Sequence, residues 1–220
     1  NGQDNVIARP TRTVSARTMS PDKGGLFDPK ATGGRGGQRW SRFELSQNIP
    51  NPVYENGIRD VLGLKKKQFE NIMAGIEGVK DGDKEIYGAA AVEYMLKNVD
   101  LKSVRKQAYD VAKNDKKASK RSSAYRTIKT IDMLERNKLS PAEAFMRKQV
   151  LVLPANMRDF KIDKDSGDFV VGDVNYLYRD LAMIDEQLKD AKKRKLPQKV
   201  ISELESGLYA GMLQLMQTEG

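Results

Sequence analysis

The stretch that decides the fold reads Val150-Leu151-Val152-Leu153-Pro154-Ala155-Asn156-Met157-Arg158, and a second segment soon after it reads Asp173-Val174-Asn175-Tyr176-Leu177-Tyr178-Arg179. Residues 150–153 are apolar and half of them are β-branched, which is typical of a buried strand. Residues 160–169 predict a hairpin that turns at 163–167, where Asp, Ser and Gly favour tight turns. A strand and a hairpin therefore lead into a segment whose pattern becomes helical at residue 173.

The C-terminal segment has the strongest helical pattern in the chain. Apolar positions step by three and four in two runs of similar length, Val174, Leu177, Leu181, Ile184, Leu188 and then Ile201, Leu204, Leu208, Gly211, Leu215. A basic run with a proline, residues 192–197, separates them. Two amphipathic helices joined by a short loop predict an antiparallel helical hairpin with an apolar seam. Gly207 and Gly211 weaken the second helix by about 1 kcal/mol each; they permit a close helix approach or mark a surface where a partner packs.

The rest of the chain predicts further helices and few strands. Helical spacing occurs within 65–74, 85–98, 100–111 and 128–134. Asp100 predicts an N-cap, and Ser140 with Pro141 and Glu143 predicts a capped helix start. Residues 40–45 predict a short strand. The expected fold class is mainly α with small β elements (α+β).

We expect four parts along the chain. Residues 1–52 form an extended N-terminal arm, a Gly-rich loop and a short strand, and residues 53–149 form a helical region. Residues 150–172 hold the strand and the loop after it, and residues 173–220 form the helical hairpin. Because the first residue is Asn1 and not Met, the numbering is expected to start inside a longer chain.

The amino-acid composition favours one class of partner and excludes several kinds of catalytic and metal site. The formal net charge is +9 and the sequence pI is about 9.5, which favours a polyanionic partner, although an inert basic surface would have the same charge. The chain has no Cys and no His. Thiolate or imidazole zinc sites, Cys nucleophiles and His general bases are therefore excluded. No apolar run reaches the roughly 18 residues that a membrane span needs, and no signal peptide is apparent.

Three patterns are candidate sites. The Gly-rich loop 33–37 could cradle phosphate, but it lacks the ending of a P-loop, so a flexible connection is the favoured interpretation. Asp163, Asp165 and Asp168 lack the frame of a calcium loop, and ordinary turn chemistry explains them. Two basic runs either contact a partner or only solvate the surface: Lys113, Lys116, Lys117, Lys120, Arg121 and Lys189, Lys192, Lys193, Arg194, Lys195.

The two opening segments resemble the clamp of the beta-prime (largest) subunit of multisubunit DNA-directed RNA polymerases. In that family an apolar strand runs into a Leu-Pro-x-x-x-Arg lid, and a Gly-x-Phe-x-x-x-Asp-x-Asn-x-Leu-Tyr-Arg segment opens a coiled coil, as residues 167–179 do here. Other blocks agree in order and approximate spacing: 17–27 with the Gly-Leu-Phe pattern, 40–45 with Glu-Leu, 49–53 with its Pro-containing continuation, and 94–101 with Asp-Leu.

The resemblance implies a clamp-like helical domain that ends in the helical hairpin. It implies a lid at 154–160 where RNA parts from template DNA, and a hairpin that projects to hold a sigma-like promoter-specificity factor. The nucleic-acid contacts expected are Arg158, Lys161, Lys113, Lys116, Lys117, Lys120, Arg121. The partner contacts expected are Arg179, Ile184, Lys192, Lys193, Arg194, Lys195, Leu204, Gly211.

Departures from the family refine these expectations. The family's four-Cys zinc ribbon is missing, because the short segment between Phe27 and Phe43 holds no Cys. The family's exposed Arg and acidic sigma contacts align with Ile184 and Leu204, which questions docking of a housekeeping sigma factor. A short, zinc-free beta-prime looks more like a phage-encoded polymerase than a cellular one. The family's magnesium loop would lie downstream of this chain.

The function expected is therefore the N-terminal clamp part of a beta-prime-like polymerase subunit with no catalytic residue of its own. Its partners would be the other polymerase subunits, a sigma-like factor, DNA and nascent RNA, with no membrane. No cofactor is expected in this chain, and magnesium would be bound elsewhere in the polymerase. The location would be the bacterial host cytoplasm or the virion. The alternative is a free-standing basic helical adaptor that binds polymerase or nucleic acid and regulates transcription. A stand-alone enzyme is disfavoured, because no acid–base pair or ligand cluster has useful spacing.

Overall fold

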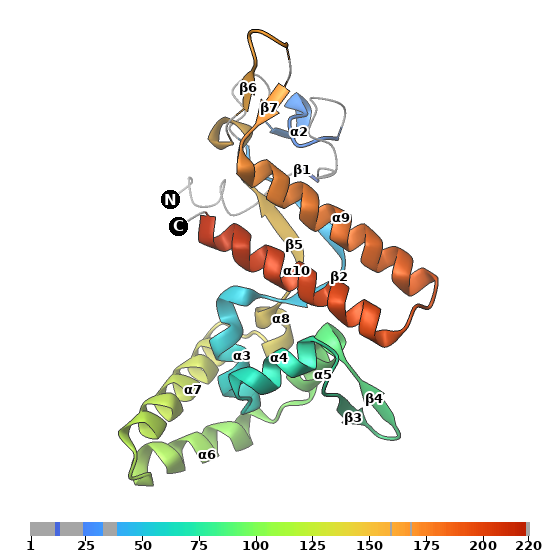
Figure 1. Ribbon diagram of the computed structural model, residues 1–220. Helices are drawn as coiled ribbons and strands as arrows, with labels where there is room; N and C mark the ends of the chain where they lie inside the picture. The colour runs from blue at the N-terminus through green and yellow to red at the C-terminus, as the bar shows by residue number, and fades with distance from the viewer. Residues whose placement is uncertain (1–11, 14–23, 33–38, 159, 168, 219–220) are drawn as a thin grey trace. The chain divides into compact units, whose positions relative to one another are not determined.

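The computed structural model describes residues 12–13, 24–32, 39–158, 160–167 and 169–218 (Figure 1). The described chain is mainly helical and has three small sheets, which confirms the expected class. It divides into two compact units. Unit one contains 1–47, 148–194 and 210–220, and unit two contains 48–147 and 195–209. The expected arm and Gly-rich loop fall largely outside the described residues.

Unit one is built around a three-stranded sheet in the order β1-β2-β5. The strands are β1 (Arg12–Thr13), β2 (Ser41–Pro50) and β5 (Met146–Val152), and β1 runs parallel to β2. The strands predicted at 40–45 and 150–153 are confirmed, and both are longer than the sequence indicated. The short helix α2 (Pro29–Thr32) precedes β2 in the sequence, and the short 3-10 helix η3 (Ala155–Met157) follows β5.

The hairpin predicted at 160–169 is confirmed as β6 (Phe160–Ile162) paired antiparallel with β7 (Phe169–Val171). Asp163 closes the turn, because its Oδ1 accepts from the backbone N–H groups of Asp165 (2.8 Å) and Ser166 (3.0 Å). These backbone bonds lower the pKa of Asp163. Gly167 takes a positive φ of 74°, a conformation that costs glycine little. The carboxylate is thus used by the turn, as ordinary turn chemistry predicts.

The helix α9 (Asp173–Lys193) packs into unit one through a polar and aromatic first half. Asn175, Tyr178 and Leu181 are buried there. The ring of Tyr178 meets Phe43 of β2 edge-on at 6.4 Å, and its hydroxyl accepts from the backbone N–H of Leu153 at 3.2 Å. In this half of α9 the predicted apolar positions Val174 and Leu177 are partly exposed. The residues that follow them, Asn175 and Tyr178, are the buried ones.

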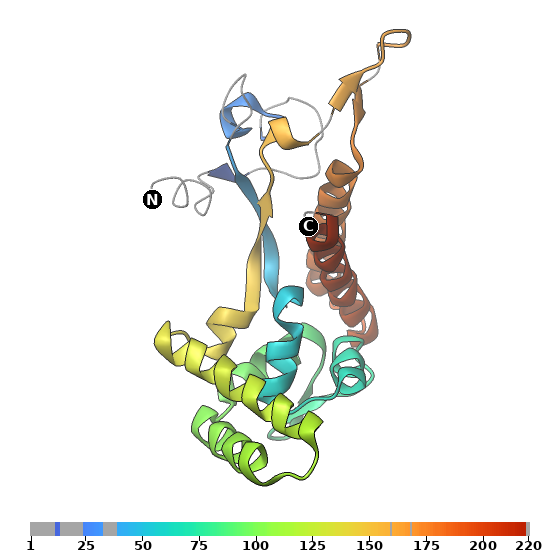
Figure 2. The same cartoon turned by 90° about the vertical axis from the view of Figure 1, so that its left-hand side faces the viewer.

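Unit two is a cluster of short helices. It contains η2 (Pro52–Tyr54), α3 (Glu55–Leu62), α4 (Lys66–Met73), a hairpin of β3 (Val79–Asp81) and β4 (Lys84–Ile86), α5 (Gly88–Asn98), α6 (Leu101–Asn114), α7 (Ala118–Arg136) and α8 (Pro141–Phe145). Figure 2 shows α6 and α7 side by side. The predicted caps are present: Asp100 accepts from two backbone N–H groups, and Ser140 with Glu143 forms a capping box. The helix expected from residue 85 begins later, because residues 84–86 pair as a strand.

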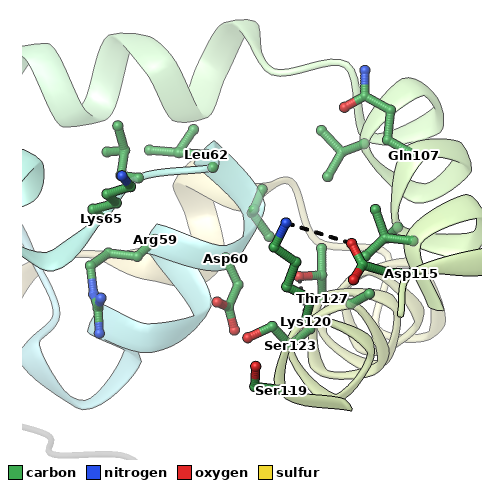
Figure 3. A pocket seen from close by; sticks show the side chains of 17 residues that line it. Arg59, Asp60, Leu62, Lys65, Gln107, Asp115, Ser119, Lys120, Ser123 and Thr127 are labelled. Carbon is green, nitrogen blue, oxygen red and sulfur yellow. Dashed lines mark hydrogen bonds and ion pairs between the residues drawn. The ribbon is translucent and has the colours of Figure 1, made fainter. Parts of the chain in front are cut away.

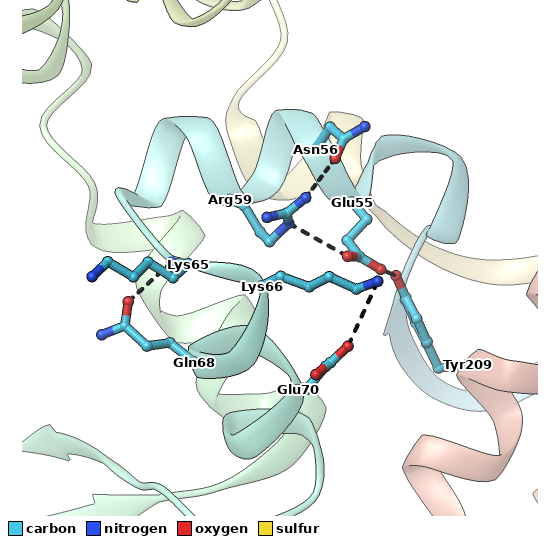
Figure 4. Close-up of polar contacts among 8 residues, drawn as sticks. All are labelled: Glu55, Asn56, Arg59, Lys65, Lys66, Gln68, Glu70 and Tyr209. Carbon is cyan, nitrogen blue, oxygen red and sulfur yellow. Dashed lines mark hydrogen bonds and ion pairs between the residues drawn. The ribbon is translucent and has the colours of Figure 1, made fainter. Parts of the chain in front are cut away.

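The helix α10 (Gln198–Thr218) supplies residues to both units. In unit two, Tyr209 donates to Glu55 of α3 at 2.5 Å (Figure 4). Its ring also stacks at a tilt on Phe69 of α4, with ring centroids 5.7 Å apart. Burial, followed by this hydrogen bond, raises the pKa of Tyr209, so its hydroxyl stays protonated. Ser206 donates to the backbone carbonyl of Met73 at 2.9 Å. The first half of α10 is therefore packed on α3 and α4, and it does not project freely as we expected.

The buried face of α10 differs from the predicted stripe. Ser202, Glu205 and Leu208 are fully buried, whereas Ile201 and Leu204 are partly exposed. Ser202 and Glu205 fit against glycines: a Cβ on Gly75 would lie 2.6 Å from the Ser202 hydroxyl oxygen, and one on Gly88 would lie 2.6 Å from a Glu205 carboxylate oxygen. Gly75 and Gly88 both have positive φ values, 73° and 67°. Glycine is thus required at both positions by backbone conformation and by close packing.

In unit one, α9 and the end of α10 approach each other closely. A Cβ on Gly211 would lie only 2.7 Å from Cδ2 of Leu181. Leu181 and Gly211 are similarly far from the connection at 194–197, so α10 returns along α9 in the opposite direction. The predicted hairpin with its short connection is confirmed. Gly211 serves the close approach of the helices, and its expected contact with a partner stays a prediction.

Candidate nucleic-acid and partner interfaces

The hairpin of α6 and α7 carries the first basic run. Its seam contains a buried cluster of three alanines and one isoleucine, Ala108, Ala112, Ala124 and Ile128. Arg105 of α6 donates to both Asp132 and Glu135 of α7. The hydrogen bond to Glu135 is the main cause that raises the pKa of Arg105. The seam and this bridge fix the register of the two helices and hold their connection, 115–117, at the end of the hairpin.

All five basic residues predicted in this run gather at that end, and we call them the basic tip: Lys113, Lys116, Lys117, Lys120, Arg121. Arg121 donates to the backbone carbonyls of Asp115 (2.8 Å) and Lys116 (3.1 Å), where α6 has carbonyls left unpaired. Lys120 pairs with Asp115 at 3.6 Å. In the part of the chain that the structure describes, Lys113, Lys116 and Lys117 are exposed and form no ion pair. These three ammonium groups are available to an external anion.

A cleft of about 770 Å³ lies beside the hairpin, between it and the connection of α3 to α4 (Figure 3). Its α7 wall is polar, with Ser119, Ser123 and Thr127. Asp60 stands in the opposite wall, 3.6 Å from Arg126, and burial raises its pKa although Arg126 and Arg59 oppose the shift. No pattern in the sequence indicated this cleft, because its walls come from three separate segments. A carboxylate and few free cations make it a poor phosphate pocket.

The structure places Arg158 inside unit one, although we expected it to face nucleic acid. It is 1% exposed, and its guanidinium donates to the carbonyl of Leu153 (2.9 Å), Oδ1 of Asn175 (2.7 Å) and the carbonyl of Leu26 (2.5 Å). It also lies 4.8 Å from the ring centroid of Phe27. Burial lowers the pKa of Arg158 to about 10, so it remains protonated at neutral pH. Arg158 joins three segments of the core and is not presented to a nucleic acid. Lys161 lies in β6, opposite Val170.

The partner contacts expected on α9 and α10 are separated by the structure. Arg179 is half-buried, bonded to Asp180 and 4.9 Å from the ring of Tyr176. Ile184 and Leu204 are both partly exposed. The second basic run is exposed at the connection of the two helices, and we call it the basic connection: Lys192, Lys193, Arg194, Lys195. Arg194 contacts Asp190 at 3.4 Å. The basic connection is thus a second cationic surface, distinct in sequence from the basic tip.

Within the described residues, no group of three or more His, Cys, Asp or Glu is placed to hold a metal ion. Over the same residues, no helix combines the length and the apolar character that crossing a bilayer requires. The chemistry that the two cationic surfaces support is the binding of anions at exposed ammonium and guanidinium groups.

Comparison with known proteins gives one consistent result. No family model matches the chain. The DNA-directed RNA polymerase subunit beta' of Mycoplasma capricolum is 32% identical over 116 residues, or 52% of this chain. The same subunit of Chlamydia felis is 28% identical over 142 residues, or 63%, and that of Petrotoga mobilis is 24% identical over 161 residues, or 72%. The chain spans 9%, 10% and 9% of these relatives. It therefore contains a region related to beta' subunits and matches a small part of their length.

Proposed function

We propose that this chain is the N-terminal clamp part of a beta'-like subunit of a multisubunit DNA-dependent RNA polymerase. The observation that carries the proposal is the similarity to beta' subunits of several bacteria, which extends over as much as 72% of the chain. The physical role is to form part of the wall of the nucleic-acid channel. The remainder of the polymerase supplies the catalytic residues and the magnesium.

The proposal assigns different partners to the two cationic surfaces. The basic tip contacts phosphates without reading sequence, which requires charge and not base-edge chemistry. The basic connection, with Ile184 and Leu204 nearby in sequence on α9 and α10, docks a sigma-like promoter-specificity factor. Because the two family contact positions are apolar here, the factor recognised should have an apolar surface and not the polar contacts of a housekeeping factor. A phage-encoded polymerase working in a bacterial cytoplasm or carried in a virion fits these departures.

Affinity purification of the chain from its native source tests the proposal. A polymerase subunit brings the other polymerase chains at stoichiometric ratio and keeps them in moderate salt. A free-standing regulator, the rival function, dissociates under the same conditions. Recovery of the chain alone, with no polymerase subunit at low salt, contradicts the proposed function.

Neutralising each cationic surface separately tests the assignment of partners. Changing Lys192, Lys193, Arg194 and Lys195 to Gln should weaken factor binding or promoter opening while the helicity is retained. The matched control changes Lys113, Lys116 and Lys117 to Gln, which should weaken DNA binding and leave factor binding intact. If the two variants behave alike, the surfaces do not have separate partners.

A further inference from the structure

Two tyrosines are exposed on the α6–α7 hairpin and are not explained by its packing. Tyr109 of α6 is 53% exposed and Tyr125 of α7 is 56% exposed. A buried aromatic ring stabilises a core, but these rings lie largely in water, where they contribute little to folding. Each of them stands in a row of basic residues. Aromatic rings among cations are what an unpaired nucleic-acid strand requires.

The spacing of these residues puts each row on one helix face. On α6 the row is Lys102, Lys106, Tyr109, Lys113, and on α7 it is Arg121, Tyr125, Lys129. Steps of three, four, seven and eight residues keep a row on one side of an α-helix. Apart from the half-buried Arg121, all members of both rows are exposed.

The bridge made by Arg105 shows that the two rows share one side of the hairpin. Arg105 precedes Tyr109 by four residues and lies 6.0 Å from its ring centroid. It reaches across to Asp132, which follows Tyr125 by seven residues and so lies on the same side of α7. The cleft is lined by different residues of the same helices, among them Gln107 and Ser123. The two rows therefore face away from the cleft, and we call them together the tyrosine face.

The register of the hairpin brings the two rings near one another. Arg105 bonds to Asp132, and the buried residues between the antiparallel helices form one cluster, Ala108, Ala112, Ala124 and Ile128. Tyr109 is therefore level with Ile128, and Tyr125 stands about one helical turn, roughly 5 Å, further along the hairpin axis. Two carboxylates near the rings, Asp132 and Glu135, are bonded to Arg105. The third, Asp110, is exposed beside Tyr109. The cations of the two rows together with Arg105 outnumber these three carboxylates, so the charge around the rings is positive: Lys102, Lys106, Lys113, Arg121, Lys129.

We propose that the tyrosine face binds a single-stranded nucleic acid, stacking unpaired bases on Tyr109 and Tyr125 while the lysines contact the phosphates. A duplex hides the faces of its bases in its own stack, so it offers the rings nothing to stack on. This inference rests partly on the proposed function, because it names the substrate class of the hairpin that ends in the basic tip. Unpaired DNA and RNA share the chemistry that the face recognises.

Fluorescence anisotropy of the full chain tests the inference. The probes are labelled oligothymidylate of about 15 nucleotides, within the range one stacking domain covers, its abasic counterpart, oligouridylate and a duplex of the same length. Oligothymidylate should bind more tightly than the abasic strand and the duplex. The comparison with oligouridylate identifies DNA or RNA as the preferred source. Equal affinity for the abasic strand, or tighter binding of the duplex, overturns the inference.

Variants locate the binding. Tyr109→Ala with Tyr125→Ala should weaken oligothymidylate binding by about tenfold or more, since each stacked base contributes appreciably to affinity. Tyr109→Phe with Tyr125→Phe should keep the affinity, because the ring remains. Tyr176→Ala, an exposed tyrosine on α9, is the matched control and should have no effect. Circular dichroism verifies folding, which Ala at exposed helix positions favours. An unchanged affinity in the double Ala variant refutes the inference, even where copurification with polymerase chains succeeds.

Discussion

At the scale of the residue, Arg158 holds the core of unit one together through its three hydrogen bonds. We predict that Arg158→Met lowers the free energy of unfolding by about 3 kcal/mol, because three buried oxygens lose their donor. Urea denaturation followed by circular dichroism measures this change. Arg179→Met, at a half-buried position in the same unit, should have a much smaller effect. Equal midpoints for Arg158→Met and the parent chain would show that the three hydrogen bonds contribute nothing.

Glu143 provides a prediction about pH. Bonds from the backbone N–H and hydroxyl of Ser140 lower its pKa. A carboxyl whose folded pKa is lowered contributes stability above its unfolded pKa, and the contribution is lost as the pH falls through the folded value. We expect Ser140→Ala to raise the pKa of Glu143 toward 4.5, since the hydroxyl no longer donates. Carboxyl titration by NMR measures it, and an unmoved Glu143 pKa would contradict the role of the hydroxyl.

The sequence predicted the caps at single residues but misjudged Arg158. The capping residues depend on neighbours two or three positions away, so their role is visible in a local pattern. The partners of Arg158 include the carbonyl of Leu26, 132 positions away in the chain. A Leu-Pro-x-x-x-Arg motif does not reveal such a partner. An arginine that looks exposed in a lid pattern can therefore be the centre of a core.

At the scale of the element, Leu181 tests the approach of α9 and α10. It is 1% exposed and lies against Gly211. We predict that Leu181→Asp destabilises unit one by about 3 kcal/mol or more, because the carboxylate would be buried without a partner. Met183→Asp on the same helix, where the side chain is 46% exposed, should leave thermal melting nearly unchanged. Similar melting curves for the two variants would mean that this contact does not hold the hairpin.

The sequence predicted most of the helical segments, although it missed α3 and began α7 ten residues too late, and it misplaced the buried face of α10. Periodicity locates a helix reliably, since apolar side chains must recur every three or four residues. It selected Ile201 and Leu204, yet the structure buries Ser202 and Glu205, which fit against glycines of unit two. A polar residue packed against glycine is invisible to a hydrophobic pattern. The β3–β4 hairpin was missed because its strands are short and mostly exposed.

At the scale of the whole molecule, the two units share one C-terminal helix. We predict that deletion of residues 195–220 destabilises α3 and α4, because Ser206 and Tyr209 no longer bond to Met73 and Glu55. Hydrogen exchange of the amides of α4 should become faster by a large factor. A synthetic peptide of residues 195–220 added in trans should restore part of the protection. Unchanged exchange in the truncated chain would show that unit two is complete without α10.

Unit two is made of two separate chain segments, 48–147 and 195–209, and this sets the order in which its contacts form during folding. The α6–α7 hairpin joins segments that are close in sequence, so its loop closes quickly. Tyr209 and Glu55 are 154 positions apart, and their contact cannot form until residue 209 has left the ribosome. Until then Phe69 and the glycines that receive α10 stay uncovered. The helix that completes unit two is therefore synthesised long after the residues that it covers, and nascent chains that stop before residue 209 should be substrates for chaperones.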